Sequence, residues 1–202
     1  MKHWSRTAVL SVAALIGAAV SVLAVSTSAS GTSGTSGTSG TTTPYCGITW
    51  GSLAKQASAT NPASSRQPSL VDVRAGQHPC FDRLVLDVAK GGSARVRYVT
   101  NVLTQGKGDV VPLRGGARLE IVALVPAYDI NTGQPTYRPA NVKELVNVTG
   151  FQTFRQVGYG GSFEGYTSIG LGVRARLPFR VFGLSGPGDR SRIVIDVAHR
   201  WS

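Results

Sequence analysis

Apolar and polar residues alternate along much of this chain, and the alternation predicts short β-strands. In segments 82–88 (DRLVLDV) and 191–197 (SRIVIDV), apolar residues occupy every second position. Successive side chains of a strand point to opposite faces of a sheet, so each segment predicts a strand with one apolar face. Extended with similar runs elsewhere, the predicted strands are 70–75, 81–89, 94–103, 117–125, 151–159, 166–175, 179–184 and 191–198.

Glycine-rich turns separate these predicted strands, and long segments with a helical period are missing from the sequence. We therefore expect an all-β sandwich or barrel. Segment 139–147 (PANVKELVN) has a helix-like pattern, although it is equally compatible with irregular structure. Segment 45–69 is expected to hold one short helix or turn, with Trp50 and Leu53 facing inward.

The two matching segments also carry matching charges. Arg83 and Asp87 lie on the face opposite the leucines of the first segment, and Arg192 and Asp196 repeat this arrangement in the second. Such an echo predicts an antiparallel domain with internal pseudo-symmetry. We expect these charges to form structural cross-strand ion pairs, and the alternative is a role in ligand binding.

The N-terminal part differs in composition from the predicted strands. Residues 1–30 have the basic start, apolar run (7–25) and small residues of a secretory signal peptide. An uncleaved membrane anchor is the alternative, because 19 apolar residues lie near the lower limit for a spanning helix. The repeats of GTS in 31–44 predict a flexible linker, which leaves 45–202 as the folded domain. Under either interpretation we expect the domain outside the cytoplasm.

Two cysteines, Cys46 and Cys80, are present in the whole chain. In an exported protein an even number favours a disulfide, and a single pairing is available. The bridge would close a loop of about 34 residues and contribute roughly 3–4 kcal/mol in the chain-entropy model. Two free thiols are the alternative.

The chain is strongly basic, with a formal net charge of +11. Removing Lys2 and Arg6 with the signal peptide lowers it to +9. Outside a bacterial cell the available polyanions are wall polymers and lipid head groups. The arginines are scattered through the predicted strands, so we do not expect a nucleic-acid partner. A membrane partner is expected only if the apolar N-terminal run is uncleaved.

The sequence contains no recognisable catalytic motif. His78 and His199 are not part of a zinc-binding spacing, and the chain has no GxSxG motif for a nucleophile. Asp82 and Glu164 could be proposed as a glycosidase pair, but so could any two carboxylates. We therefore predict a protein that is not an enzyme and has no metal site or cofactor. A hydrolase would require Asp82, Glu164 or His199 to converge in one cleft.

Segment 154–166 (FRQVGYGGSFEGY) is the best candidate binding surface. Arg155, Tyr159, Phe163 and Tyr166 alternate there with glycines that would let a ligand approach the backbone. Aromatic rings stack on sugars, and arginine binds carboxylates or phosphates. The alternative is that these aromatic residues belong to the core.

The echoed strands and several longer segments resemble a known family. The likeness is carried by 80–88 (CFDRLVLDV), 111–122, 147–165 and 170–201, which ends PFRVFGLSGPGDRSRIVIDVAHRW. These segments resemble the AMIN-like domain of exported actinobacterial proteins, which is related to the AMIN domain.

This resemblance implies a β-sandwich of two small antiparallel sheets related by pseudo-symmetry. It also implies a non-catalytic module that targets cell-envelope proteins to the wall, in some members by binding peptidoglycan. This chain departs from the AMIN pattern by inserting 126–165 between the two halves. Our first hypothesis is a wall-associated module that binds peptidoglycan or another anionic wall glycan. The alternative is a protein-interaction or envelope-assembly module that uses the 126–165 insert, which could instead be a packed flap over a sheet edge.

Overall fold

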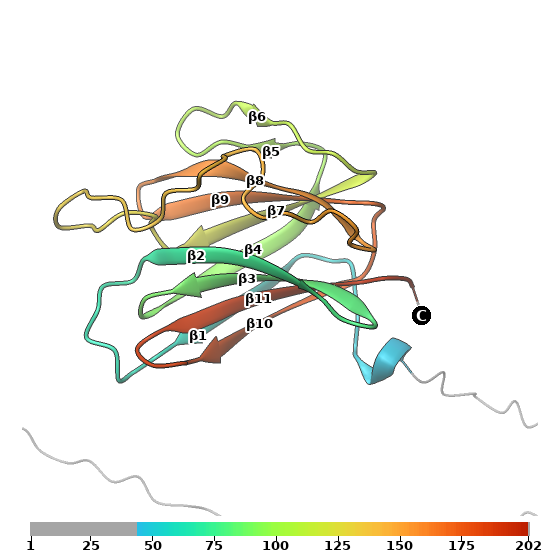
Figure 1. The fold of residues 1–202 in the computed structure, drawn as a ribbon, viewed down its shortest axis with the longest axis horizontal. Coiled ribbons are helices and arrows are strands. Elements are labelled where there is room, and N and C mark those ends of the chain that lie inside the picture. The colour runs from blue at the N-terminus through green and yellow to red at the C-terminus, as the bar shows by residue number, and fades with distance from the viewer. Residues whose placement is uncertain (1–43, 202) are drawn as a thin grey trace, which may run out of the picture. The chain divides into compact units, whose positions relative to one another are not determined.

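The predicted all-β sandwich is confirmed by the computed structural model, in which two antiparallel sheets pack face to face (Figure 1). The structure describes residues 44–201, so the predicted signal peptide and the linker before Pro44 lie outside the described residues. The five-stranded sheet has the order β1 (Lys55–Thr60), β4 (Gly91–Val99), β7 (Ala117–Leu124), β9 (Tyr166–Val173) and β8 (Phe154–Phe163). The four-stranded sheet has the order β10 (Phe179–Ser185), β11 (Ser191–Ala198), β3 (Phe81–Val88) and β2 (Leu70–Gln77).

The core lies between the two sheets and is filled by the alternating apolar residues of the strands. Branched aliphatic side chains dominate it, among them Leu84, Leu86, Ile193, Ile195, Leu119, Ile121, Ile169 and Leu171. Each of these side chains is fully buried. The period-2 pattern in the sequence therefore identified the inner face of both sheets.

The two echoed segments lie side by side at the centre of the four-stranded sheet. Strands β3 and β11 pair antiparallel, so that Arg83 lies opposite Asp196 and Asp87 lies opposite Arg192. A local two-fold relationship thus exchanges the two segments, and it places each arginine across from the aspartate of the other strand.

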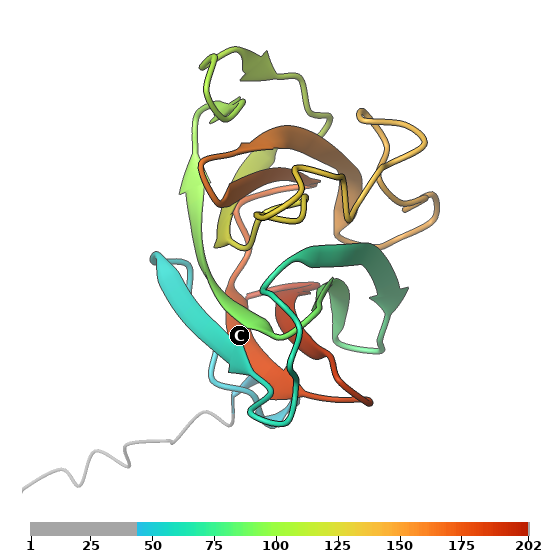
Figure 2. The ribbon, with the colours of Figure 1, turned by 90° about the vertical axis from the view of Figure 1, so that its left-hand side faces the viewer.

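On one side of the sandwich, β1 and β10 join the two sheets (Figure 2). The Phe179 amide donates a hydrogen bond to the Gly51 carbonyl oxygen over 2.8 Å. The backbones approach so closely that a Cβ atom at Gly183 would lie 2.0 Å from the Ser58 carbonyl oxygen. A glycine is therefore needed where β10 passes β1.

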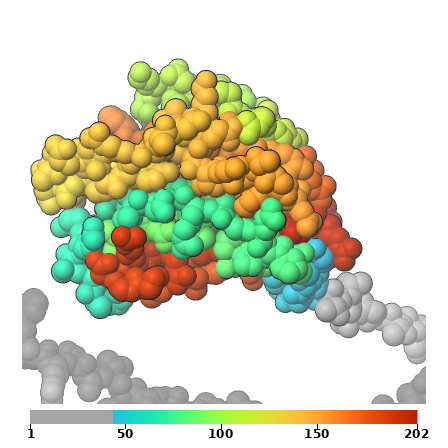
Figure 3. Space-filling view, viewed as in Figure 1, coloured from blue at the N-terminus to red at the C-terminus, as the bar shows by residue number. Residues whose placement is uncertain are grey.

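On the other side, the part of the insert that precedes β8 (126–153) bridges the edges of the two sheets, which are β2 and the insert's own strand β8. The Leu145 amide donates to the Val157 carbonyl oxygen of β8 over 2.8 Å. The Leu70 amide of β2 donates to the Pro126 carbonyl oxygen over 2.7 Å. In the space-filling view the insert forms a continuous yellow-to-orange band next to β2 (Figure 3). The insert is thus a packed cover for two sheet edges.

A short hairpin covers part of the outer face of the five-stranded sheet. It consists of β5 (Val102–Leu103) and β6 (Val110–Val111). The predicted strand 94–103 was too long, because β4 ends at Val99 and the chain then turns into this hairpin. Val102, Val111 and Leu113 form a small buried cluster beneath it.

The structure corrects or decides the local predictions for further segments. Segment 45–69 contains the 3₁₀-helix η1 (Tyr45–Gly47), but its Leu53 is 78% exposed and does not face inward. The strand β1 in the same segment was missed, because its apolar residues are alanines. Segment 139–147 forms turns, which is the irregular alternative left open for it: its backbone follows the edge of β8, and an Asn141 side-chain oxygen accepts the Lys143 amide over 2.9 Å. The predicted strand 151–159 begins at Phe154.

The predicted disulfide between Cys46 and Cys80 is present, with the two Cα atoms 6.4 Å apart. It ties η1 to the turn between β2 and β3. Trp50 packs nearby on Phe81, and its indole N–H donates to the Tyr45 carbonyl oxygen over 2.8 Å. The N-terminal segment of the domain is thereby fixed at one end of the sandwich.

Candidate functional site

The four residues predicted as a binding surface do not share one site. Arg155 Nη1 donates hydrogen bonds to the carbonyl oxygens of Phe151 (3.1 Å) and Phe154 (2.8 Å), so its guanidinium is bound to the backbone. Phe163 and Tyr166 are paired positions on either side of the β8–β9 turn, and they are 51% and 44% exposed. Tyr159 is half-buried against the insert.

At two glycines in or beside this surface, the space that a ligand would use is filled by the protein itself. A Cβ atom at Gly158 would lie 3.1 Å from the side chain of Leu113. One at Gly172 of the neighbouring strand β9 would lie 2.0 Å from the Arg114 carbonyl oxygen. At these two positions the glycines admit the segment after β6 rather than a ligand.

The insert forms a concave surface that we call the tyrosine hollow. Its volume is about 660 Å³. The side chains that define it are Tyr128, Pro135, Tyr137, Arg138, Pro139 and Tyr159. It joins one residue predicted from the sequence, Tyr159, to residues of the insert that were not among the predicted site residues.

Backbone contacts hold the tyrosine hollow in shape. The amides of Thr136 and Tyr137 donate to the Ala127 carbonyl oxygen over 3.0 and 3.3 Å. Tyr128 Oη accepts a hydrogen bond from the Gly165 amide at the β8–β9 turn over 3.0 Å. The Tyr137 and Tyr159 rings meet edge to face, with centroids 6.1 Å apart. The aromatic surface is therefore fixed by both the insert and β8.

Two hydroxyl groups in the tyrosine hollow are available to a ligand. Within residues 44–201, neither Tyr137 Oη nor Tyr159 Oη has a hydrogen-bond partner. Every buried side-chain polar atom of the described residues has such a partner, so these two hydroxyls are not buried and must reach solvent. Burial of the rings raises the pKa of Tyr137 to about 12 and raises the pKa of Tyr159. Both hydroxyls therefore remain protonated at neutral pH and can donate as well as accept.

The hollow also carries a cation. Arg138 is exposed, and no carboxylate of the described part of the chain lies within ion-pair distance of it. A guanidinium in this state can bind a carboxylate or phosphate in a bidentate manner. The chemistry of the tyrosine hollow suits a hydroxylated ligand with a negative charge.

Comparison with known proteins identifies the family. The model of the AMIN-like domain matches residues 68–199. The chain belongs to the AMIN-like domain family. No curated protein and no solved structure gives a significant match. AMIN-like domains are typically extracytoplasmic, and membership indicates a cell-envelope module. Among the described residues, no helix is long and apolar enough to span a membrane.

A second polar surface of this AMIN-like domain lies on the open part of the five-stranded sheet. We call it the sheet-face patch, and it contains Tyr166, Arg95, Arg97 and Glu120. Arg97 Nε donates to Glu120 Oε2 over 2.7 Å. Arg95 is exposed and has no ion pair within residues 44–201. Tyr166 is thus placed beside a cation, as the sequence hypothesis requires, but away from Tyr159.

Two residues that a hydrolase would need do meet in the AMIN-like domain. His199 Nε2 lies 3.1 Å from Asp82 Oδ1, while Glu164 lies elsewhere, in the exposed β8–β9 turn. Asp82 Oδ2 accepts the amides of Thr153 and Phe154 over 2.6 and 3.0 Å. Because Asp82 and His199 are both buried, they clamp β3 to the start of β8 and do not open into a cleft.

Metal ligands are also dispersed. The described residues contain no group of three or more His, Cys, Asp or Glu side chains that could hold a metal ion.

Part of the tyrosine hollow was signalled by the sequence of the AMIN-like domain. Segment 126–150 stands out by its prolines and by Tyr128 and Tyr137. This segment lies near Tyr159 because the insert runs along β8. No local sequence pattern predicts that path. No feature of the sequence marked Arg138 as a site residue.

Proposed function

We propose that this AMIN-like domain is an exported, non-catalytic module that binds a wall glycan, with peptidoglycan as the preferred ligand. The proposed site is the tyrosine hollow. The observation that carries the proposal is the combination of half-buried tyrosine rings, two unpartnered hydroxyls and the unpaired guanidinium of Arg138.

Each component of the hollow matches one part of a peptidoglycan unit. Tyrosine rings offer flat apolar faces for the C–H face of a sugar ring. The hydroxyls of Tyr137 and Tyr159 can bind sugar hydroxyl or amide groups. Arg138 can bind a carboxylate of the lactyl group or peptide stem.

The overall charge supports the same class of ligand. The formal net charge of +9 that remains without Lys2 and Arg6 attracts anionic polymers over a distance set by the ionic strength. This attraction is not specific, so the tyrosine hollow has to supply the selectivity for a glycan.

The test is co-sedimentation of residues 41–202, which contain the whole described domain (44–201), with purified peptidoglycan sacculi. We expect the wild-type domain to sediment at low salt. The double variant Tyr137→Phe/Tyr159→Phe keeps both rings and removes both hydroxyls. It should weaken binding about tenfold or more, because each lost hydrogen bond contributes about 1 kcal/mol.

The matched control is Tyr166→Phe, which removes a tyrosine hydroxyl from the sheet-face patch. Its binding should equal that of the wild type. If Tyr166→Phe weakens binding and the double variant does not, the sheet-face patch is the site. If the wild-type domain stays in the supernatant at low salt, the proposal fails.

The alternative is a protein-interaction module that uses the 126–165 insert. It is favoured by Val142, an apolar side chain of the insert that is 53% exposed. Deleting the insert is a poor test, because residues 126–165 include β8 itself and the edge of β2 would also lose its cover. The substitution Val142→Asp changes the surface alone. The alternative predicts that this variant loses capture of an envelope protein and keeps binding to sacculi.

A further inference from the structure

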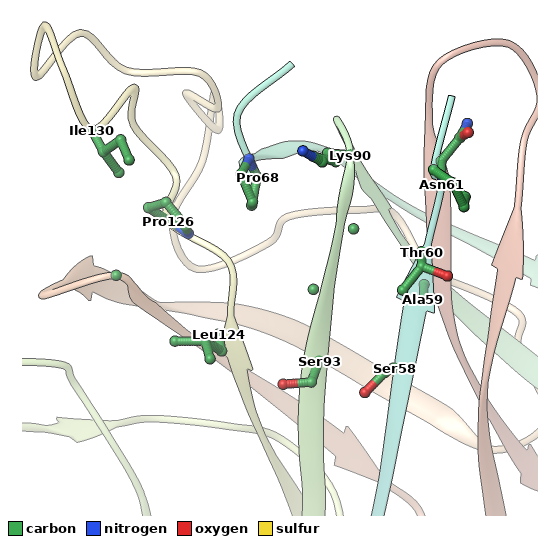
Figure 4. A pocket seen from close by; sticks show the side chains of 14 residues that line it. Ser58, Ala59, Thr60, Asn61, Pro68, Lys90, Ser93, Leu124, Pro126 and Ile130 are labelled. Atoms are coloured by element: carbon green, nitrogen blue, oxygen red, sulfur yellow. The ribbon is translucent and has the colours of Figure 1, made fainter. Parts of the chain in front are cut away.

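A second concave surface lies where β1 ends and β4 begins, and we call it the apolar hollow (Figure 4). Its volume is about 590 Å³. Segments 58–62, 90–93 and 124–130 contribute to it, and it is separate from the residues that line the tyrosine hollow. Figure 4 shows Leu124, Pro126 and Ile130 on one side, and Ser58 and Thr60 on the other.

The walls of this hollow are apolar although water can reach them. Leu124 and Ile130 are 50% and 56% exposed, which is unusual for two large aliphatic side chains at one site. The floor is backbone: a Cβ atom at Gly92 would lie 2.2 Å from Val125 Cγ2, so no larger side chain fits there. The prolines of the lining, Pro62, Pro68 and Pro126, restrict the backbone of its walls.

The polar side chains that line the hollow are few: the hydroxyl groups of Ser58, Thr60 and Ser93, the amide of Asn61 and the ammonium group of Lys90. The Asn61 side-chain amide donates to the carbonyl oxygens of Gly188 and Arg190 over 2.8 and 2.9 Å. Lys90 is exposed between the two walls, and within the described chain it has no ion pair. The residues that line the hollow include no carboxylate.

A further positively charged side chain lies next to the apolar hollow. Ser93 and Leu124 line both the apolar hollow and the sheet-face patch, so the unpaired Arg95 lies next along the same surface. An apolar recess with a basic rim fits a hydrocarbon chain that ends in an anionic group.

A peptide fits this recess less well than a hydrocarbon. The strands that border it, β1 and β4, pair with each other, and β10 covers the far side of β1 at Ser58. No free strand edge is therefore offered to a peptide backbone at this site. A peptide would bring polar amide groups to a surface that offers few hydrogen-bond partners. A hydrocarbon chain has no polar groups that need such partners.

We propose that the apolar hollow binds an amphiphile with a single hydrocarbon chain and an anionic head. The chain packs against Leu124, Pro126 and Ile130, and the head group lies at Lys90. This inference concerns a different site from the glycan proposal and does not depend on it.

Calorimetric titration of residues 41–202 tests the inference, with the probes kept below their micellar concentrations. Dodecyl phosphate and farnesyl phosphate share an anionic head and distinguish a linear chain from a prenyl chain. Inorganic phosphate supplies the head alone, and dodecyl maltoside supplies the chain with a neutral head. We expect at least one of the two alkyl phosphates to bind, inorganic phosphate not to compete, and the maltoside to bind more weakly.

The double variant Leu124→Asn/Ile130→Asn should weaken binding of that phosphate about tenfold or more, because both side chains would be covered by the hydrocarbon. Leu53→Asn is the matched control, since Leu53 is an exposed leucine away from the hollow, and it should leave binding unchanged. Lys90→Gln should weaken binding of the phosphate and leave binding of the maltoside unchanged.

Three results would overturn the inference. The first is the absence of binding by both dodecyl phosphate and farnesyl phosphate. The second is equal affinity in the Leu124→Asn/Ile130→Asn variant and the wild type. The third is equal competition by inorganic phosphate, which would mean that the chain is not held. Because sacculus binding is measured through Tyr137 and Tyr159, each proposal can fail without the other.

Discussion

Arg83 and Asp196 form a bidentate ion pair between the two echoed strands. Arg83 Nε donates to Asp196 Oδ1 over 2.6 Å, and Arg83 Nη2 donates to Asp196 Oδ2 over 2.9 Å. A second arginine, Arg180 of β10, donates its Nε to Asp196 Oδ2 over 2.8 Å. The side chain of Asp196 is completely buried, so the two guanidiniums replace its water.

The pseudo-symmetric counterpart of this pair does not form. Arg192 donates instead to the carbonyl oxygen of Gly186 over 2.9 Å, in the turn between β10 and β11. Asp87 is bound by Arg74 of the edge strand β2, with Nε to Oδ2 over 2.6 Å. The pseudo-symmetry of the sequence therefore sets the register, while the neighbours of each strand decide the partners.

The first prediction compares these two related aspartates. Asp196→Asn leaves Arg83 and Arg180 sharing a buried neutral amide, and we expect it to lower the free energy of unfolding by about 2–4 kcal/mol. Asp87→Asn should cost about 1 kcal/mol or less, because its partner Arg74 is half-exposed. Urea denaturation of both variants checks this order.

Equal losses for the two aspartates would contradict it. The salt dependence offers an independent check, because added salt screens the exposed pair of Arg74 and Asp87 more than the buried pair of Arg83 and Asp196.

The alternation of apolar residues was enough to predict the inner faces of both sheets, whereas the pairing and register of the two echoed strands came from the structure. It was not enough for β1. Its sequence KQASAT offers alanines rather than branched residues, and the strand forms because Ala59 packs into the core and its backbone pairs with β4. Leu53 was expected to face inward because leucine is apolar. It lies instead in the exposed segment just before β1.

The second prediction concerns the buried carboxylate of Asp82. Its Oδ2 accepts two backbone amides, and Asp82→Ala would leave the Thr153 and Phe154 amides buried without an acceptor. We expect a loss of about 3 kcal/mol or more in the free energy of unfolding. Hydrogen exchange should accelerate at these two amides well before it changes at the central strand β7. Unchanged exchange at both amides would contradict the clamp.

The third prediction concerns the close passage of β10 over β1. Gly183→Ala would place a Cβ atom 2.0 Å from the Ser58 carbonyl oxygen, so β1 and β10 must separate. We expect a loss of about 2 kcal/mol or more. Gly76→Ala is the matched control on the edge strand β2, because no atom lies within 4 Å of its Cβ position.

Gly76→Ala should change stability by less than about 1 kcal/mol. Thermal unfolding of the two variants measures the difference. Equal stability would mean that β1 does not approach β10 as closely as described.

The candidate site was less predictable than the fold, for a reason that Arg155 illustrates. Its sequence position among aromatic residues suggested an exposed guanidinium for a ligand. The side chain instead returns to carbonyl oxygens of the segment before β8, which is a contact that no periodic pattern encodes. The apolar hollow is assembled from segments far apart in the sequence, and the tyrosine hollow from two parts of the insert, so both residue sets depend on the path of the insert.

The fourth prediction concerns alkaline pH. Burial of Tyr98 raises its pKa from 10.0 to about 12 in the folded protein. Its hydroxyl donates to the Leu177 carbonyl oxygen over 2.6 Å and accepts the Leu177 amide over 2.9 Å. The unfolded chain loses this proton first as the pH rises. The stabilisation is therefore complete below pH 10 and is lost toward pH 12.

Because part of the ring is exposed, we expect this loss to be roughly 1–2 kcal/mol. Urea midpoints between these two pH values should fall less steeply in Tyr98→Phe than in the wild type. The variant should also be less stable at pH 7, since the Leu177 amide loses its acceptor. An identical alkaline slope in both proteins would contradict the assignment.

The last prediction separates binding from stability with two arginines of the same region. Arg138 is unpaired in the described structure, so Arg138→Gln should weaken sacculus binding about fivefold or more and leave the free energy of unfolding unchanged within about 0.5 kcal/mol. Arg155 is bound to the backbone carbonyls of Phe151 and Phe154. Arg155→Gln should therefore lower stability by about 1 kcal/mol and leave sacculus binding of the folded protein unchanged. Co-sedimentation and urea denaturation of both variants give four measurements. A loss of binding confined to Arg155→Gln would instead support the sequence-based site around Arg155 and exclude a role for the guanidinium of Arg138.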